Sequence, residues 1–239
     1  MRVLYETVCT DSYIKSPNFI CLDDVDINDL DKRETYHCFV SLKAKRKLLE
    51  NKIKISVEDN PDQFTSQFLL SHFNDMILST NMVLVPFGAI HNGLDIDTEE
   101  VFLRPNSGYK IFPGQVVSLK EIRLFNSTYK IQNDVLCARS SVVDIVSEKR
   151  TFLSIPNRKI ITESLYSHDT KKQSIDFYVD DIVKRLFAKM EVDLLPDVIV
   201  ADFALTYDNK VKLIEFNSAT TSGLYKCNIG QIITEIENL

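Results

Sequence analysis

The stretch that decides the fold is Asp197-Val-Ile-Val-Ala-Asp-Phe-Ala-Leu-Thr-Tyr-Asp-Asn-Lys-Val-Lys-Leu-Ile-Glu-Phe-Asn217. Apolar residues dominate both halves of this stretch, which predicts strands over Val198–Leu205 and Val211–Asn217. Between them stands Asp208-Asn209, a pair that tolerates the positive φ angles of a tight turn. The stretch therefore predicts a β-hairpin.

The register of this hairpin brings two carboxylates together. A two-residue turn at Asp208-Asn209 makes Tyr207 face Lys210 and places Asp202 directly opposite Glu215. Asn217 lies two residues beyond Glu215 and projects from the same face. A loop of odd length would break this register.

Both faces of the predicted hairpin are otherwise apolar, which is typical of a hairpin at the centre of its sheet. The register predicts that the face of Asp202 also carries Val198, Val200, Ala204 and Leu213. It predicts that the opposite face carries Ile199, Ala201, Phe203, Ile214 and Phe216. Facing side chains lie about 5 Å apart, so two carboxylates there need a shared proton, a basic partner or a divalent cation. Two carboxylates and an amide oxygen are the hard oxygen ligands that Mg²⁺ prefers. The alternative is a solvated hairpin with incidental acids, and the apolar alternation argues against it.

A second segment, Val101–Val116, offers positive charge. An apolar strand ends on Arg104, and a loop of small residues then leads to Lys110. Gly108 and Gly114 stand in this segment, where backbone amides could approach an anion. Arginine grips phosphate oxygens bidentately and lysine acts as a mobile point charge. Alone, the segment is equally consistent with a strand end and a surface turn; together with the hairpin it suggests phosphate and Mg²⁺ in one cleft.

A third segment places Glu148 and Arg150 on one face of a predicted strand, and Ser164 and Tyr166 on one face of the next. A salt bridge on a solvated sheet edge is the simpler interpretation of the charged pair.

Composition excludes several classes of protein. The chain has 239 residues, 44% hydrophobic and 26% charged, but only 6 glycines, and it contains neither G-x-x-x-x-G-K-[ST] nor G-x-G-x-x-G. The net charge of −6 argues against a nucleic-acid or membrane-surface protein. Its 5 cysteines form no C-x-x-C pair and its 4 histidines are scattered, so a zinc site is not expected. With neither a signal peptide nor a long apolar run, we expect a cytoplasmic protein.

The order of elements predicts an α+β fold with a largely antiparallel sheet. A small α/β part is expected over residues 1–95, with a strand at Tyr36–Leu42 and a helix at Pro61–Leu78 capped by Asn60. Residues 96–239 are expected to form the second part. Further strands are predicted at Met82–Val85, Val101–Arg104, Asp134–Ala138, Glu148–Ile155 and Arg158–Tyr166, and further helices at Ile175–Met190 and Ile229–Glu237.

Taken in order, these motifs resemble the ATP-grasp superfamily. The resemblance rests on Leu103-Arg-Pro with Lys110 and Gly114, on Glu148-x-Arg150, and on Asp202 followed by Glu215-x-Asn217 and the loop Ala219–Tyr225. More narrowly, they resemble a small clade found in bacteriophages and bacteria and named for an arginine and two lysines. The resemblance spans roughly residues 82–226.

The resemblance implies ATP held between two α+β subdomains, with Mg²⁺ held by Asp202, Glu215 and Asn217. It implies that Arg104 and Lys110 contact phosphate, Lys110 from a flexible flap, and that Arg150 contacts the γ-phosphate or an acyl phosphate. Glu148 is expected to contact the nucleotide, and adenine is expected near Leu136–Ala138, where the acidic hinge of many members is missing. For the second lysine of the clade, Lys120 and Lys149 stay open.

The implied activity is that of a carboxylate–amine ligase, which joins small-molecule, peptide or protein carboxylates and amines through an acyl phosphate. A kinase and a non-catalytic ATP-binding module are alternatives. A metal-dependent nuclease of the PD-(D/E)xK type is another, because Pro196-Asp197 precedes Glu215-x-Asn217. Against the nuclease, Asn217 stands where its lysine belongs. The sequence identifies neither the substrates nor an oligomeric state.

Overall fold

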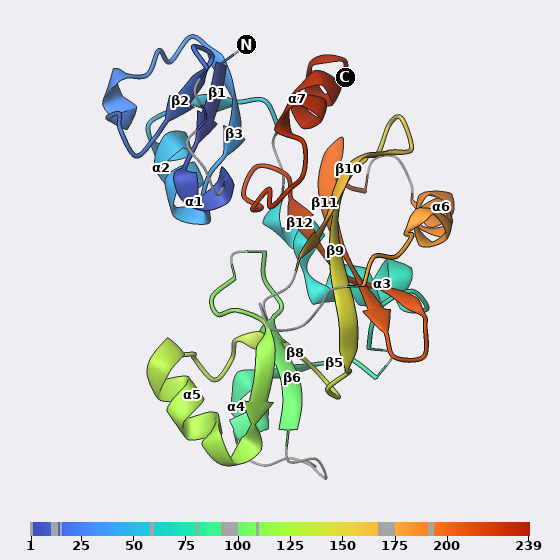
Figure 1. Ribbon diagram of the computed structural model, residues 1–239. Helices are drawn as coiled ribbons and strands as arrows, with labels where there is room; N and C mark the ends of the chain where they lie inside the picture. The colour runs from blue at the N-terminus through green and yellow to red at the C-terminus, as the bar shows by residue number, and fades with distance from the viewer. Residues whose placement is uncertain are drawn as a thin grey trace.

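A computed structural model describes residues 2–10, 14, 16–57, 60–79, 81–91, 100–108, 110–166, 175–190 and 194–239. Within these residues the chain forms three four-stranded sheets, which we call the N-terminal, second and third sheets in chain order (Figure 1). The predicted α+β fold with largely antiparallel pairing is confirmed.

The N-terminal sheet is entirely parallel and has the strand order β2-β1-β3-β4. Its strands are β1 (Arg2–Tyr5), β2 (Phe19–Cys21), β3 (Thr35–Phe39) and β4 (Lys54–Ile55), and its helices are α1 (Thr7–Thr10), η1 (Ile27–Asp29) and α2 (Leu42–Glu50). The strand predicted to run to Leu42 ends at Phe39, because Ser41 caps α2 by accepting a hydrogen bond from the amide of Ala44.

The second sheet is antiparallel, with the order β5-β8-β6-β7. It consists of β5 (Val83–Pro86), β6 (Glu100–Pro105), β7 (Gln115–Ser118) and β8 (Leu136–Ser140), with helices α4 (Phe87–His91), η3 (Leu119–Glu121) and α5 (Ile122–Tyr129). Phe87, Leu103, Phe112, Ile122 and Cys137 form the core between this sheet and α4 and α5. The opposite face carries Phe102 and Arg104, which line a cavity.

The third sheet is antiparallel, with the order β10-β9-β11-β12 (Figure 1). Its strands are β9 (Ile145–Ser154), β10 (Lys159–Tyr166), β11 (Val198–Thr206) and β12 (Val211–Ser218). Helices α3 (Ser66–Phe73) and α6 (Asp180–Lys189) pack on one face, and the N-terminal sheet and α7 (Ile229–Glu237) pack on part of the other. Within the described residues β11 lies between β9 and β12, but β12 is the edge strand, so the prediction of a hairpin at the centre of its sheet was correct for β11 and wrong for β12. The apolar Leu213 and Phe216 of β12 belong instead to the core on the α3 and α6 face.

The helix predicted over Pro61–Leu78 is interrupted. Asn60 does cap a helical turn, in a capping box with Gln63, but that turn is the short 3₁₀ helix η2 (Pro61–Phe64). Thr65 then starts α3 by accepting a hydrogen bond from the amide of Phe68. The prediction of one helix was wrong because a second capping residue lies inside the apolar pattern. Similarly, α6 begins at Asp180 and not at Ile175, and Ile229–Glu237 is helical as predicted.

The tip of the β11–β12 hairpin differs from the predicted turn. Its loop has three residues, 207–209, with Leu205 paired to Val211 and Asn209 at φ 58°. This odd loop would move Glu215 to the wrong face, but the register shifts again between Asp202 and Phe203. Ile214 is the extra residue of this β-bulge.

The bulge has two consequences for the faces of the hairpin. Asp202 is paired with Glu215, as predicted. Leu213, however, packs in the core beside Phe203, while Ile214 faces a cavity, so the predicted faces of Leu213 and Ile214 were wrong.

The boundary predicted near residue 95 falls among residues 92–99, outside the described residues. Just before it, β5 pairs with β8 of the second sheet. Among the described helices, none combines the length and apolar character that crossing a bilayer requires.

Candidate functional site

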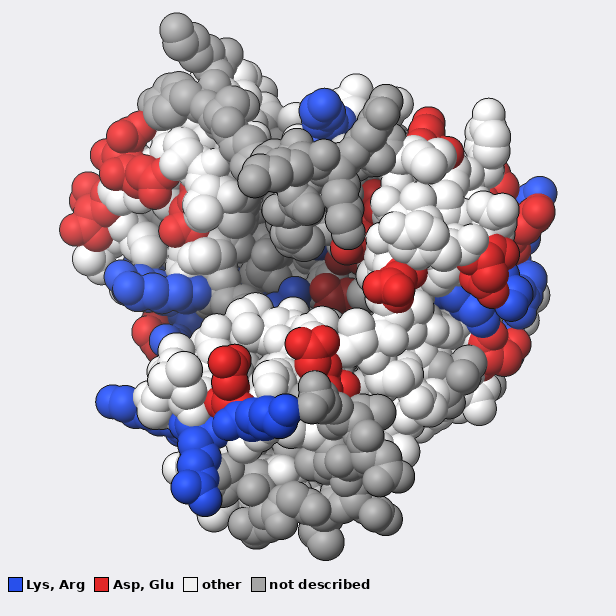
Figure 2. Space-filling view, turned by 60° about the horizontal axis from the view of Figure 1, so that its bottom comes forward, with Lys and Arg blue, Asp and Glu red and all other residues white. Residues whose placement is uncertain are grey.

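A cavity of about 490 Å³ lies between the second and third sheets. Phe102, Arg104 and Lys110 line it from the second sheet and its loop, and Arg150, Asp202 and Glu215 line it from the third. In the space-filling view the molecule is hollowed between its halves, and charged side chains of both signs lie inside the hollow (Figure 2).

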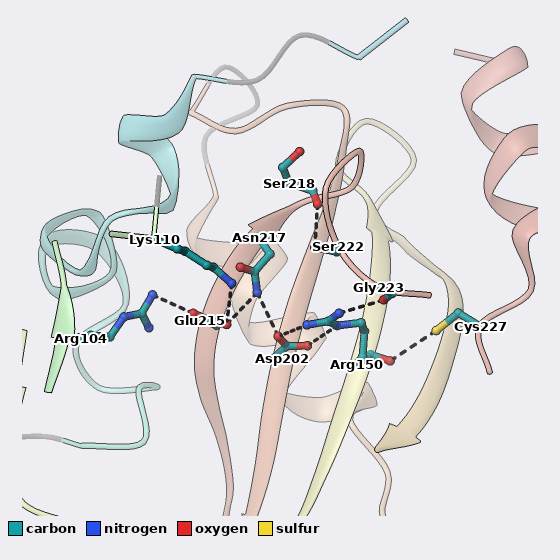
Figure 3. Close-up of polar contacts among 10 residues, drawn as sticks. All are labelled: Arg104, Lys110, Arg150, Asp202, Glu215, Asn217, Ser218, Ser222, Gly223 and Cys227. Carbon is teal, nitrogen blue, oxygen red and sulfur yellow. Dashed lines mark hydrogen bonds and ion pairs between the residues drawn. The ribbon is translucent and has the colours of Figure 1, made fainter. Parts of the chain in front are cut away.

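Asp202 and Glu215 form the centre of this cavity. The Asp202 side chain is 1% exposed and that of Glu215 is 20% exposed. Asn217 donates from Nδ2 to Oδ2 of Asp202 at 3.0 Å and to Oε1 of Glu215 at 2.9 Å. The three side chains therefore converge, as the strand register predicted (Figure 3).

Two cations from the second sheet and its loop neutralise Glu215. Nη2 of Arg104 lies 2.8 Å from Oε2, and Nζ of Lys110 lies 3.6 Å from Oε1. Burial by itself would raise the pKa of Glu215, but Arg104 and Lys110 outweigh it and lower that pKa to about 2. Glu215 is therefore ionised at neutral pH.

Arg150 neutralises Asp202 from the other side (Figure 3). Its Nε and Nη2 donate to the two oxygens of Asp202 at 2.9 and 2.8 Å, and its Nη1 donates to the carbonyl oxygen of Gly223 at 2.8 Å. Burial raises the pKa of Asp202 in spite of this bidentate pair, and the charge of Glu215 adds to the effect.

Two tyrosines complete this side of the cavity. The rings of Tyr166 and Tyr225 are stacked, with centroids 4.8 Å apart and planes 6° apart. The guanidinium of Arg150 lies 4.8 Å from the centroid of Tyr225 and 5.5 Å from that of Tyr166. Burial raises the pKa of the Tyr166 phenol, and the charges of Asp202 and Glu148 add to this.

The donor set fits one hard cation bound together with an anion. Two carboxylates and an amide are hard oxygen donors, and in the described part of the chain no three His, Cys, Asp or Glu side chains gather as a self-sufficient metal cluster. A cation here needs further oxygens from water or from a ligand. The cavity lining carries three cations, Arg104, Lys110 and Arg150, and three carboxylates, Glu148, Asp202 and Glu215, so a bound divalent cation would leave it net positive and would favour an anionic ligand.

Most of the predicted site residues meet in this cavity. Arg104, Lys110, Glu148, Arg150, Asp202 and Glu215 line it, and Asn217 bonds to two of them. Leu136 and Ala138 do not line it. The lining from β8 comes from its end and from the segment that follows, Ser140–Val143, with Met82, Ile145 and Ile214.

Neither candidate for the second lysine lines the cavity. Lys149 lies on the opposite face of β9 from Arg150, where it pairs with Glu163 at 2.8 Å and Asp176 at 2.9 Å. Lys120 lies in η3. Asp197, the first acid of the nuclease alternative, is exposed before β11 and is not part of the cavity lining.

Tyr225, Ile214 and Ser140–Val143 were not predicted as site residues. Tyr225 belongs to the loop singled out by the resemblance, so a signal for it existed. Ile214 carried no such signal, because only the bulge turns it toward the cavity.

Several solved structures have a similar fold. The D-cycloserine synthetase DcsG matches at a TM-score of 0.59 with 11% identity, over 99% of each chain. D-alanine–D-alanine ligase from Bacillus anthracis, complexed with ATP, matches at 0.56 with 11% identity, over 100% of this chain and 96% of that one. A RimK domain protein from Sphaerobacter thermophilus matches at 0.55 with 9% identity, over 99% and 96%. At such identities the likeness establishes the fold alone.

The chain belongs to the family described as ATP-grasp domain, R2K clade family 2, whose pattern matches residues 77–234. No curated protein matches the sequence.

Proposed function

We propose that this protein is an ATP- and Mg²⁺-dependent carboxylate–amine ligase. The observation that carries the proposal is the convergence of Asp202, Glu215 and Asn217 with three cations in one cavity between two antiparallel sheets. Family membership and the ligases among the structural neighbours support it.

Each part of the cavity has a role in this proposal. Asp202, Glu215 and Asn217 hold Mg²⁺, which when bound withdraws charge from the phosphate oxygens. Arg104 and Lys110 bind the phosphates. Ser140–Val143 and the apolar side chains around it accommodate adenine, and Glu148 contacts the nucleotide beside them.

The proposed reaction has two steps. A substrate carboxylate oxygen attacks the γ-phosphorus, the bond to the β,γ-bridging oxygen breaks, and ADP leaves. The amine nitrogen then attacks the acyl carbon, inorganic phosphate leaves, and the nitrogen loses a proton. Arg150 stabilises the charge of the transferring phosphoryl group and of the acyl phosphate.

The alternatives differ in what they consume. A kinase would stop after phosphoryl transfer, and a binding module would release no ADP. For the nuclease alternative, neither the family nor the position of Asp197 offers support.

Calorimetric titration with the non-hydrolysable analogue AMP-PNP tests the metal assignment. We expect binding that requires Mg²⁺ and collapses on Asp202→Asn or Glu215→Gln, because each change removes an anionic ligand. Glu50→Gln, an exposed change on α2, is the control. Full Mg²⁺-dependent binding by both site variants would refute the metal assignment.

The substrates require a separate screen. Amino acids and short peptides, supplied in pairs with Mg²⁺ and ATP, are scored for release of ADP and phosphate. ADP release without phosphate release or amide formation would indicate a kinase, and tight ATP binding without any turnover across the screen would favour the binding module.

A further inference from the structure

Arg150 is held by contacts of two kinds. Its bidentate pair with Asp202 involves a proposed metal ligand, whereas its contacts with the carbonyl of Gly223 and with the rings of Tyr166 and Tyr225 do not. A metal at Asp202 competes for the same carboxylate oxygens. The second kind of contact is then what keeps the guanidinium in place.

The geometry points to Tyr166 and Tyr225 as positioning residues: we propose that their stacked pair keeps Arg150 directed at the γ-phosphate when Asp202 binds metal. This inference rests on the proposed function, in which Arg150 contacts that phosphate. It adds a role that the sequence motifs do not contain.

The register of the sheet fixes one half of the stack. Arg150 pairs with Ser164 across β9 and β10, and Glu148 pairs with Tyr166. Tyr166 is thus the diagonal neighbour of Arg150 on the cavity face, within reach of a long side chain. A guanidinium over an aromatic face is stabilised by the negative electrostatic potential of the ring's π face, and more strongly when water is excluded. Arg150 is 7% exposed.

The backbone of Tyr225 fixes the other half. The backbone of this residue has φ 49°, a left-handed conformation that residues other than glycine, asparagine and aspartate rarely adopt. Its ring nevertheless stacks on Tyr166 with planes 6° apart. A strained backbone that presents a stacked ring at a cavity is typical of a functional constraint.

The loop that carries Tyr225 is itself anchored. The amide of Leu224 donates to the carbonyl of Cys9 at 2.8 Å, and the hydroxyl of Ser222 donates to the carbonyl of Ser218 at 2.7 Å. The ring is therefore presented from a tied loop, as a positioning role requires.

The experiment compares the affinity for Mg²⁺·AMP-PNP with that for Mg²⁺·ADP by calorimetry. The Kd for Mg²⁺·ADP divided by the Kd for Mg²⁺·AMP-PNP measures the preference for the γ-phosphate. General damage to the cavity weakens the binding of both nucleotides alike and leaves this ratio unchanged. We expect Arg150→Met to reduce this ratio, and Tyr225→Leu and Tyr166→Leu to reduce it roughly threefold to tenfold. Tyr225→Phe and Tyr166→Phe keep the rings and should leave the ratio of the unaltered protein unchanged.

Two further variants guard against a folding defect. Tyr225→Asn removes the ring with a residue that tolerates positive φ, so it should lower the ratio without loss of thermal stability. Tyr207→Leu makes the same change at the exposed hairpin tip and should alter neither nucleotide's affinity.

The outcomes separate the inference from the proposed function. If the unaltered protein binds neither nucleotide, the proposed function fails. If it binds both, two results would overturn the positioning role while the nucleotide site stands. One is that the leucine and asparagine variants have the same ratio as the unaltered protein; the other is that the phenylalanine variants lower the ratio as much as the leucine variants do.

Discussion

Arg104 and Glu215 belong to different sheets, yet Nη2 of the arginine lies 2.8 Å from Oε2 of the glutamate across the cavity. The pair joins the second sheet to the third at the point where we propose that phosphate and metal bind. In the proposed complex, Arg104 leaves Glu215 and contacts phosphate, and Glu215 leaves Arg104 and binds Mg²⁺.

This exchange predicts opposite effects from one substitution. Arg104→Met removes the cation that competes for Glu215, so Mg²⁺ alone should bind severalfold more tightly. The same change removes a phosphate contact, so Mg²⁺·AMP-PNP should bind roughly tenfold or more weakly. Calorimetry with the metal alone and with the nucleotide measures both.

Arg123→Met, an exposed change on α5, provides the matched control and should alter neither affinity. If Arg104→Met weakened both ligands, competition for Glu215 would be disproved.

Lys149 and Arg150 are neighbours in sequence but lie on opposite faces of β9. Lys149→Met should therefore leave nucleotide affinity within about twofold, whereas Arg150→Met should weaken AMP-PNP binding. Methionine fills a similar volume beside Phe177, and both acidic partners, Glu163 with a side chain 37% exposed and Asp176 with one 77% exposed, stay in contact with water, so the loss of stability should be small. Paired titrations and urea unfolding of the two variants check this. A large loss of affinity in Lys149→Met would return Lys149 to the list of candidate site residues.

The proposed adenine end can be tested with one type of substitution at two positions. Ile214→Gln places a polar group in the cavity and should weaken nucleotide binding roughly fivefold through lost apolar contact. Leu136→Gln, on β8 outside the cavity lining, should leave it unchanged. The reverse result would move adenine back toward Leu136–Ala138.

Glu235 on α7 predicts a pH dependence of stability. Burial opposes its ionisation, but Lys159 and Asn157 outweigh burial and lower its pKa from 4.5 to about 2. A carboxyl whose pKa is lowered by folding stabilises the protein above its unfolded pKa, and that contribution is lost as pH falls from about 4.5 to about 2.

Glu235→Gln should therefore lower the free energy of unfolding by about 1–3 kcal/mol at pH 7 and reduce its decline in acid. Urea unfolding from pH 7 down to pH 3 measures both. Glu50→Gln, an exposed change, should keep the acid slope, and an unaltered slope in Glu235→Gln would contradict the assignment.

The carboxylate pair could be predicted because strand alternation and a short hairpin restrict the register strongly. The faces of Leu213 and Ile214 could not, because the tip loop and the bulge each shift the register by one residue and compensate for each other at Glu215. The prediction for Asp202 and Glu215 was correct, although the turn it assumed was wrong.

Alternation alone could also have separated Lys149 from Arg150, since adjacent strand residues point to opposite faces. The contact between Arg104 and Glu215 had no comparable local signal. It joins residues far apart in the chain, and charge complementarity only suggested that their segments share a cleft.

The bulge at Ile214 also lies between the tip of the hairpin and the pair of Asp202 and Glu215. One odd residue in the loop at 207–209 has already been absorbed before the strands reach Asp202 and Glu215. The tip, where Tyr207 is 70% exposed and does not line the cavity, is thus a suitable place for an internal affinity tag or a fluorophore.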